Sequence, residues 1–400
     1  MCSVALGREV FRYAAGDVPQ QEPDDPQRPR TTPRLTASLP TFSRHEAAQP
    51  VEQVFSLVVA EGREEGRRIA LSERAVIAGR DPNLDIVLPD DDVSRLHCLI
   101  SVVNGDVVVE NLGSTNGTFV NGQRVDRRTA LPVGGVLRVG EHLFRCERCT
   151  RRDLERAEEE YRDLQRAASY VQTLLPPPLL DGPMRTEWML QPSARLGGDA
   201  LGYSRIDDRH FALYLIDVSG HGVSAAMLSV SVLNVLRERV LPATDFKDPV
   251  GVLSALNAMF QMDRHDDHYF TIWYGVYDSF DRLLTYATGG HHAGYLVPVE
   301  RDHARALKTS GPVIGAIAGA CFPAAQTDVP AGSVLYLFSD GVFEIRSAER
   351  QLRLSDFTTF LTLPIAADGS ECRRLFDQVK SACRGRPLED DFSMLVVTFP

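Results

Sequence analysis

The stretch GGDALGYSRIDDRHFALYLIDVSGHG, Gly197 to Gly222, contains two strand-like runs on either side of a short polar break, Asp207–Arg209. Two such runs joined by three turn-forming residues predict a β-hairpin. With Asp208 at its centre, Asp199 lies opposite Asp217, because each is nine residues from the centre. Opposed residues have Cβ atoms about 5 Å apart, and two carboxylates this close repel each other unless a proton or a cation lies between them. The stretch therefore predicts a metal site.

The composition excludes several classes of protein. A chain of 400 residues has room for two or three domains. The net charge of −11 disfavours a general nucleic-acid binder. The longest apolar run, VIGAIAGACFPAA, is shorter than the roughly 18 residues of a membrane span, and the N-terminus lacks a signal-peptide pattern. These features predict a cytoplasmic protein with neither nucleic acid nor membrane as a partner.

The cysteine pattern favours free thiols. Seven cysteines scattered over the chain are typical of reduced thiols in a cytosol. Cys146 and Cys149 have the spacing of zinc ligands, but no second pair of this kind follows them. Free thiols are therefore favoured over a structural zinc ion.

The first 149 residues divide into an arm and a β-rich segment. Residues 1–50 contain seven prolines and no sustained periodicity, which is typical of a disordered arm. This arm offers Thr31, Thr32 and Thr36 as phosphorylation sites. Residues 51–149 instead consist of short strand-like runs such as VFSLVVA, CLISVV and DVVVEN, separated by turns. Strands this short and regular predict an all-β antiparallel sandwich.

A change of composition at residue 150 marks a helix, because Glu, Arg, Leu and Ala then dominate and Gly and Pro are absent. Apolar residues recur at alternating steps of three and four, a seam about three heptads long. The seam consists of Leu154, Ala157, Tyr161, Leu164, Ala168, Val171 and Leu175. It predicts either a parallel coiled coil that makes a homodimer through residues 150–175, or one amphipathic helix lying on its own protein. Prolines from Pro176 onward end the helix, within a linker of residues 150–178.

Residues 179–400 mix helical and strand-like runs. AAMLSVSVLNVLRERVL and DPVGVLSALNAMFQM have helical periods, whereas FTIWYGVYD, LLTYATGG, SVLYLFSD and FSMLVVTF have the character of strands. Strands that occur in groups, rather than in strict alternation with helices, predict an α+β sandwich with antiparallel sheets.

Further acidic residues stand at strand ends, as Asp199 and Asp217 do. SVLYLFSDGV ends an apolar run at Asp340, and LEDDFSMLVVTF places Asp390 and Asp391 just before the last strand. One aspartate at a strand end usually makes a turn. Several together, with two opposed across one hairpin, favour a site for a hard cation, which binds oxygen ligands.

Six blocks in the C-terminal half resemble one family in order and spacing. They are LGGD, IDVSGHGVSAAMLS, YATGGHHAGYLV, SGPVIGAI, LFSDGVFE and DDFSMLVV. With the lead-in YVQTLLPPPL, they resemble the SpoIIE/RsbU-type branch of the PPM metal-dependent serine/threonine phosphatases, over essentially all of residues 165–400. The resemblance implies an αββα sandwich, with two sheets between two helical layers, that binds two divalent cations, Mn²⁺ or Mg²⁺.

The resemblance also implies which groups bind the cations. They are Asp199, Asp217, the Val218 carbonyl, Asp340 and Asp390, with Asp391 as the alternative to Asp390. Asp217 bridges both ions, Asp199 and Val218 hold one, and the later aspartates hold the other. His221 either approaches the site or braces the loop. Two metals activate a water that attacks phosphorus in line, so the implied reaction needs no nucleophilic side chain.

One position departs from the family pattern. Many relatives have a second aspartate three residues after the first, where this chain has Gly202. The glycine implies weaker metal binding or a variant subgroup, and it is the only support for an inactive phosphatase-fold scaffold. The aspartates that remain oppose the scaffold interpretation.

Three blocks in residues 54–147 resemble a second family. AGRDP, SRLHCLI and NLGSTNGTFVNG resemble the forkhead-associated (FHA) module, which binds phosphothreonine. The resemblance implies that Arg80 and Ser94 hold the phosphate, that Arg95 adds charge, and that Thr115 and Asn116 shape the peptide contact. His97 and Gly79 are implied to brace the loops. An arginine fork with hydroxyl and amide donors binds a dianion strongly.

Both resemblances predict a signalling phosphatase that hydrolyses phosphoserine or phosphothreonine on a partner protein. The implied partner is a STAS-type anti-anti-sigma factor, and the FHA module is expected to bind a phosphothreonine peptide or the chain's own phosphorylated arm. Two alternatives stay open, an inactive scaffold that acts through phosphopeptide binding and a two-metal phosphodiesterase acting on nucleotides. The negative net charge disfavours the second.

Overall fold

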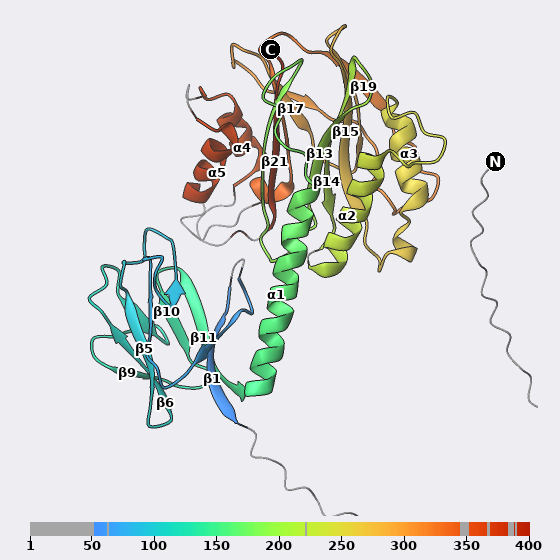
Figure 1. Ribbon diagram of the computed structural model, residues 1–400. Coiled ribbons are helices and arrows are strands. Elements are labelled where there is room, and N and C mark those ends of the chain that lie inside the picture. The colour runs from blue at the N-terminus through green and yellow to red at the C-terminus, as the bar shows by residue number, and fades with distance from the viewer. Residues whose placement is uncertain are drawn as a thin grey trace, which may run out of the picture. The chain divides into compact units, whose positions relative to one another are not determined.

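The computed structural model describes residues 52–61, 64–220, 222–344, 352–365, 369–382, 388 and 390–400. They belong to one compact unit, Val51–Pro400, in which Figure 1 labels the main elements. The predicted arm with its three threonines, and also His221, lie outside the described residues. In the described ranges, no helix combines the length and the apolar character needed to cross a membrane.

The N-terminal part is a sandwich of two β-sheets, as predicted. One sheet has the order β2-β1-β11-β10-β7-β8 and the other β4-β3-β5-β6-β9. The first comprises β1 (Gln53–Val59), β2 (Arg68–Leu71), β7 (Thr118–Val120), β8 (Gln123–Arg124), β10 (Val136–Val139) and β11 (His142–Thr150). The second comprises β3 (Val76–Gly79), β4 (Ile86–Val87), β5 (Cys98–Val103), β6 (Asp106–Asn111) and β9 (Thr129–Leu131).

Strand pairing in this sandwich is antiparallel except between β3 and β4, which are parallel. Alternate residues of both sheets meet in one apolar core that includes Leu57, Ile100 and Leu137. The strand-like runs found in the sequence did not include β9, which has three residues.

Cys146 and Cys149 both lie in β11. Since they are three residues apart on a strand, their side chains point to opposite faces and cannot hold one ion together. Cys146 is buried, Cys149 is half-buried beside Ser56, and both are free thiols. The structure thus favours the thiol interpretation over structural zinc.

The predicted linker helix is α1 (Arg151–Leu174). Its first turn is capped by Thr150, whose Oγ1 accepts a hydrogen bond from the Asp153 amide at 3.0 Å. Leu154 and Leu175 are buried at the two ends of the apolar seam, and the seam residues between them are half-buried. The coiled-coil pairing of α1 stays a prediction.

The C-terminal part has two five-stranded sheets, β12-β21-β20-β17-β18 and β13-β14-β15-β16-β19. The strands of the first are β12 (Arg185–Gln191), β17 (Gly294–Val297), β18 (Arg305–Leu307), β20 (Val334–Phe338) and β21 (Phe392–Thr398). The strands of the second are β13 (Ala200–Arg205), β14 (His210–Val218), β15 (Phe270–Asp278), β16 (Leu283–Gly289) and β19 (Ala324–Asp328). All pairings are antiparallel, and the apolar core between the sheets contains Leu215, Trp273 and Leu395.

Helices cover both outer faces of this pair of sheets (Figure 1). On one side, α2 (Val223–Glu238) packs against β13 and β14, and α3 (Pro249–Met259) packs against β15 and β16. On the other, α4 (Leu354–Leu361) and α5 (Glu371–Ala382) bury Phe357 and Leu375 against the sheet that contains β12, β21, β20 and β17. The layer order is therefore αββα, as the resemblance implied.

Candidate active site

The β13–β14 hairpin has the register that its sequence predicts. Ala200 pairs with Ile216 and Arg205 with Phe211, so the centre of the hairpin is residue 208. Continued by one position, this register places Asp199 opposite Asp217. Asp199 is only 4% exposed, whereas Asp217 is half-buried.

The other sheet, which contains β20 and β21, brings its aspartates to the same end of the sandwich. β20 ends at Phe338 and β21 begins at Phe392, and Phe338 pairs with Met394. Asp340 therefore follows the end of one strand, while Asp390 and Asp391 precede the start of its neighbour. Asp217 experiences the charges of all three of these aspartates. The structure thus brings every aspartate singled out from the sequence into one acidic group.

Burial and mutual repulsion disfavour ionisation of this acidic group. Burial is the main cause that raises the pKa of Asp217 to about 7, and repulsion by Asp340 and Asp390 adds to it. Burial and then Asp390 raise the pKa of Asp340 to about 6. Burial and then Asp217 raise the pKa of Asp199 well above its usual range. Without a cation, the group therefore retains protons that isolated aspartates would have lost.

Asp391 has a different surrounding from Asp390, although the two are adjacent. Its Oδ1 accepts hydrogen bonds from the Ser193 amide at 2.8 Å and hydroxyl at 2.9 Å, and its Oδ2 accepts one from the Gly198 amide at 2.8 Å. A Cβ at Gly197 would lie 2.9 Å from the Asp391 carboxyl carbon, so the first glycine of GGD allows this close approach. Asp391 therefore fixes the loop before Asp199, and Asp390 Oδ1 accepts a hydrogen bond from the Asp391 amide at 2.8 Å.

Gly202 does not leave a gap in the acidic group. Gly202 pairs with Tyr214, and a Cβ on it would lie 2.6 Å from Tyr214 Cε2. Because Gly202 is three residues from Asp199, an odd step along the strand, a side chain there would point to the opposite face. The tyrosine ring, which stacks on Tyr274, fills that space. A side chain at position 202 would therefore not reach the acidic group, so Gly202 does not argue for an inactive scaffold.

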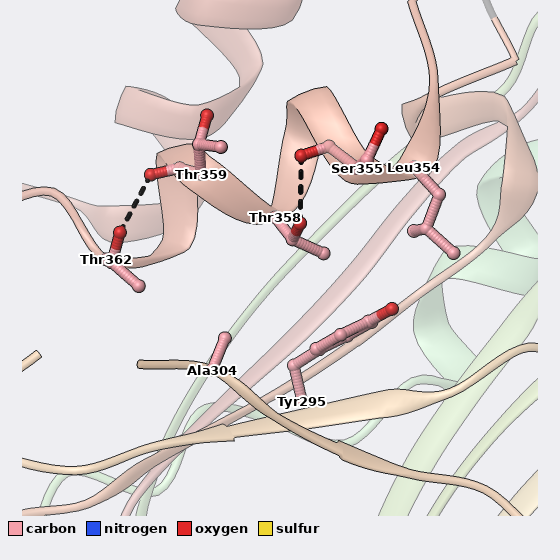
Figure 2. Close-up of a pocket in the computed structure, with 7 residues that line it drawn as sticks. All are labelled: Tyr295, Ala304, Leu354, Ser355, Thr358, Thr359 and Thr362. Carbon is pink, nitrogen blue, oxygen red and sulfur yellow. Dashed lines mark hydrogen bonds between the residues drawn. The ribbon is translucent and has the colours of Figure 1, made fainter. Parts of the chain in front are cut away.

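A pocket of about 520 Å³ lies elsewhere, between α4 and β17 (Figure 2). It is lined by Tyr295, Ala304, Leu354, Ser355, Thr358, Thr359 and Thr362. The hydroxyls of Thr358 and Thr362 donate to the carbonyls of their own helix. This pocket contains no residue of the acidic group.

The residues predicted to bind phosphopeptide converge on three loops at one edge of the N-terminal sandwich. The Thr115 amide donates to Ser94 Oγ at 3.1 Å, the Asn116 amide group donates to the Asp92 carbonyl at 2.7 Å, and the Arg80 amide donates to the Ser94 carbonyl at 3.0 Å. The side chains of all but Ser94, which is half-buried, are exposed at this edge, Arg95 included. This arrangement presents two guanidinium groups and a hydroxyl to solvent.

His97 connects these loops from the buried interior of the sandwich. It is fully buried, its Nδ1 accepts a hydrogen bond from the Ser94 amide at 3.1 Å, and its Nε2 donates to the Gly117 carbonyl at 3.1 Å. This pair of bonds requires the neutral ring, and burial lowers the pKa of His97 accordingly. A Cβ at Gly79 would lie 2.9 Å from the Arg95 carbonyl carbon. Both residues therefore occupy bracing positions.

Two family models match the chain. Residues 207–400 match the model for Stage II sporulation protein E (SpoIIE), and residues 76–140 match the model for the FHA domain. The chain carries an FHA domain followed by a SpoIIE domain.

Individual relatives agree with this assignment. The SpoIIE domain is similar to Phosphoserine phosphatase RsbP of Bacillus subtilis, with 26% identity over 187 residues, which are 46% of this chain and 45% of that protein. The FHA domain is similar to FHA domain-containing protein FhaB of Mycobacterium tuberculosis, with 41% identity over 85 residues, 21% of this chain and 55% of that protein. The chain thus spans about half the length of each of these curated relatives.

A solved structure supports the fold of the SpoIIE domain. The SiaA-PP2C domain of Pseudomonas aeruginosa superposes with a TM-score of 0.52 at 16% sequence identity, covering 61% of this chain and 98% of that chain. At this level of identity, the similarity establishes a shared fold.

The acidic group of the SpoIIE domain has the donor chemistry of a divalent-cation site. Asp199 Oδ2 is buried and lacks a hydrogen-bond partner among the described residues. Carboxylate oxygens are the ligands that hard cations such as Mg²⁺ prefer. In the described ranges, no three His, Cys, Asp or Glu side chains are gathered tightly enough to hold a metal ion as they stand. The residues therefore fit such cations in kind, and binding requires the repelling carboxylates to move closer together.

Sequence reasoning missed three residues around the two sites. Ser193 binds Asp391 in the SpoIIE domain, and Asp91 forms an ion pair with Arg80 in the FHA domain at 2.6 Å. His268 contacts the loop after β14, where its Nδ1 lies 2.7 Å from the Ser219 carbonyl. No motif marks these residues, because each acts through a partner that lies well away from it in the sequence.

Proposed function

We propose that the SpoIIE domain is a metal-dependent protein phosphatase that hydrolyses phosphoserine or phosphothreonine on a partner protein. The observation that carries the proposal is the buried acidic group at the shared end of two sheets, with the unpartnered Asp199 Oδ2 inside it. The similarity to a protein named a phosphoserine phosphatase supports the substrate class.

The proposed ligands are those that the family resemblance implies, and the acidic group that the structure brings together supports them. Asp217, whose pKa is raised by burial and by the charges of Asp340 and Asp390, would contact both of two divalent cations, Mn²⁺ or Mg²⁺. Asp199 and the Val218 carbonyl would hold one, and Asp340 and Asp390 the other. When bound, the cations supply an activated water for in-line attack and neutralise charge on the phosphoryl oxygens. Asp391 orients the Gly197–Asp199 loop through its three hydrogen bonds.

The proposal is tested by Mn²⁺-dependent hydrolysis of p-nitrophenyl phosphate and of a phosphoserine protein by the full-length chain. We expect turnover that Asp217→Asn abolishes while the fold is retained. A folded wild-type protein without turnover would favour the scaffold alternative. Turnover of cyclic nucleotides in preference to phosphoproteins would instead favour the phosphodiesterase alternative.

We further propose that the FHA domain binds phosphothreonine through Arg80, Ser94 and Arg95, with Thr115 and Asn116 contacting the peptide. The exposed guanidinium groups beside a fixed hydroxyl support this role. Fluorescence anisotropy with a labelled phosphothreonine peptide tests it. We expect binding that Arg80→Ala abolishes and that the unphosphorylated peptide does not show.

The proposed setting is cytoplasmic signalling. A STAS-type anti-anti-sigma factor is the proposed substrate, and dephosphorylation of such a protein in vitro tests that choice. Phosphorylation of Thr31, Thr32 or Thr36 would let the FHA domain bind the chain's own arm. Protection of the arm in hydrogen exchange, lost in Arg80→Ala, tests this contact. Homodimer formation through residues 150–175 is tested by the mass of the chain in solution.

A further inference from the structure

Three hydrogen bonds connect the loop after β14 to the entry of β15. The Ser219 amide donates to the Tyr269 carbonyl at 2.9 Å, and the Tyr269 amide donates to Ser219 Oγ at 3.1 Å. The third joins His268 Nδ1 to the Ser219 carbonyl at 2.7 Å. Because a carbonyl oxygen only accepts, the ring must donate from Nδ1. Every polar group of Ser219 is thus bonded to His268 or Tyr269.

The same loop carries the Val218 carbonyl that is proposed to bind a cation. A Cβ placed on Gly198 would lie 2.9 Å from the Val218 carbonyl oxygen and 3.3 Å from that of Gly220. These two carbonyls therefore turn toward the Gly197–Asp199 loop, whereas the Ser219 carbonyl between them turns to His268. The bond from His268 fixes this alternation.

The His268 ring also lies against the glycine that turns the loop. Gly220 has φ of +83°, and the nearest atom to the position of its missing Cβ is His268 Cε1 at 3.4 Å. Glycine adopts this left-handed conformation without strain. The His268 ring packs beside Gly220 and donates a hydrogen bond to Ser219, so it restricts the backbone freedom that the glycine gives to the loop.

His268 is itself held by a compact turn. Its amide donates to the His265 carbonyl at 2.9 Å, and the Met262 amide donates to the Gly315 carbonyl at 3.1 Å. Asp266 and Asp267 both have positive φ, 52° and 60°, within this turn. Two consecutive non-glycine residues in the left-handed region are costly, and such strain persists only where surrounding contacts impose it. The turn thus presents His268 to Ser219 from a fixed backbone.

From these contacts we infer that His268 is a positioning residue for the cation site. It holds the Val218–Gly220 segment so that the Val218 carbonyl turns toward Gly198, the residue before Asp199. This inference rests on the proposed phosphatase function, since it concerns the same site. Groups that orient a metal ligand without touching the metal commonly change metal affinity about 10-fold or more when removed.

The test compares His268→Leu, which keeps the bulk and loses the donor, with His268→Asn, which keeps an N–H donor. His265→Ala is the matched control, because His265 lies in the same turn but packs on Phe260. Mn²⁺ binding to the full-length, chelator-treated protein is measured by calorimetry and by the rise in unfolding temperature. We expect about 10-fold weaker binding for His268→Leu, near wild-type binding for His268→Asn, and no change for His265→Ala.

Equal Mn²⁺ affinity in wild type and His268→Leu would overturn the inference, and so would an Asn variant as weak as Leu. If His268→Leu fails to fold, Ser219→Ala, which removes the Oγ acceptor on the same loop, must weaken Mn²⁺ binding for the inference to survive. A wild-type protein that binds Mn²⁺ but hydrolyses no phosphomonoester would refute the proposed function while leaving the positioning role standing.

Discussion

Replacing Asp217 by asparagine is expected to stabilise the metal-free SpoIIE domain at neutral pH and to abolish its response to metal. Burial and neighbouring carboxyls raise the pKa of Asp217 from 3.8 to about 7. Below the lower value the carboxyl is protonated in both the folded and the unfolded chain, so it has no effect on the free energy of unfolding. Between the two values only the unfolded chain loses the proton, and stability falls by about 1.4 kcal/mol per pH unit.

The span from 3.8 to about 7 corresponds to a loss of about 4 kcal/mol once the pH exceeds the upper value. This loss of about 4 kcal/mol is the most that Asp217 alone can contribute, because part of the repulsion belongs to Asp340 and Asp390, which titrate together with it. Asparagine is uncharged at every pH. The variant is therefore expected to be more stable than metal-free wild type by about 2–4 kcal/mol at about pH 8, and by less than about 1 kcal/mol at about pH 4.

Urea unfolding followed by tryptophan fluorescence measures this difference, because both tryptophans, Trp188 and Trp273, lie in the C-terminal sandwich. Mn²⁺ should stabilise wild type by mass action and leave Asp217→Asn unchanged. Asp208→Asn, at the exposed tip of the same hairpin, is the control and should change stability by less than about 0.5 kcal/mol. If the difference in free energy of unfolding between Asp217→Asn and metal-free wild type does not increase with pH, the reasoning is refuted.

Four other substitutions separate the roles of individual residues. Gly202→Asp should destabilise the protein by about 1–3 kcal/mol in thermal unfolding, because its Cβ would overlap a buried tyrosine ring. Tighter Mn²⁺ binding by this variant would contradict the assignment of Gly202 as a packing position. Asp91→Asn should strengthen phosphothreonine-peptide binding about 2- to 5-fold in anisotropy at low salt, because Asp91 competes for Arg80 through an exposed ion pair; weaker binding would show that Asp91 has another role. Asp391→Ala should lower the free energy of unfolding by about 2 kcal/mol or more, since it leaves loop donors unpaired. Asp390→Asn should instead reduce turnover and Mn²⁺ affinity, with little effect on the stability of the metal-free protein. The reverse pattern would exchange the roles of the two aspartates.

Local patterns were sufficient for much of the fold. The strands β14, β15, β20 and β21 and the helices α1, α2 and α3 were expected close to their observed bounds. α4 and α5 were not expected, although α5 is strongly amphipathic. The α5 N-terminus is capped from β12, where the Glu187 carboxylate accepts hydrogen bonds from the Glu371 and Cys372 amides, both at 3.1 Å. Such a cap, supplied by a residue distant in sequence, leaves no signal in the helix's own segment.

The sequence by itself determined the register of the β13–β14 hairpin and hence the opposition of Asp199 and Asp217. Turn position and the alternation of side chains are local properties, so counting residues was enough. The convergence of Asp340 and Asp390 on the same end was indicated by strand ends and by family resemblance. The seam of α1 likewise followed from spacing along one helix.

Only the tertiary structure decided what surrounds these groups. Asp391 became a brace because Ser193, 198 residues earlier in the chain, places its amide and hydroxyl on that carboxylate. Gly202 became a packing position because Tyr214 occupies the space beside it. His268, 49 residues after Ser219 in the chain, contacts it because β14 and β15 pair. Hydrogen bonds and close contacts of this kind depend on how separate segments pack, and no periodicity within one segment encodes them.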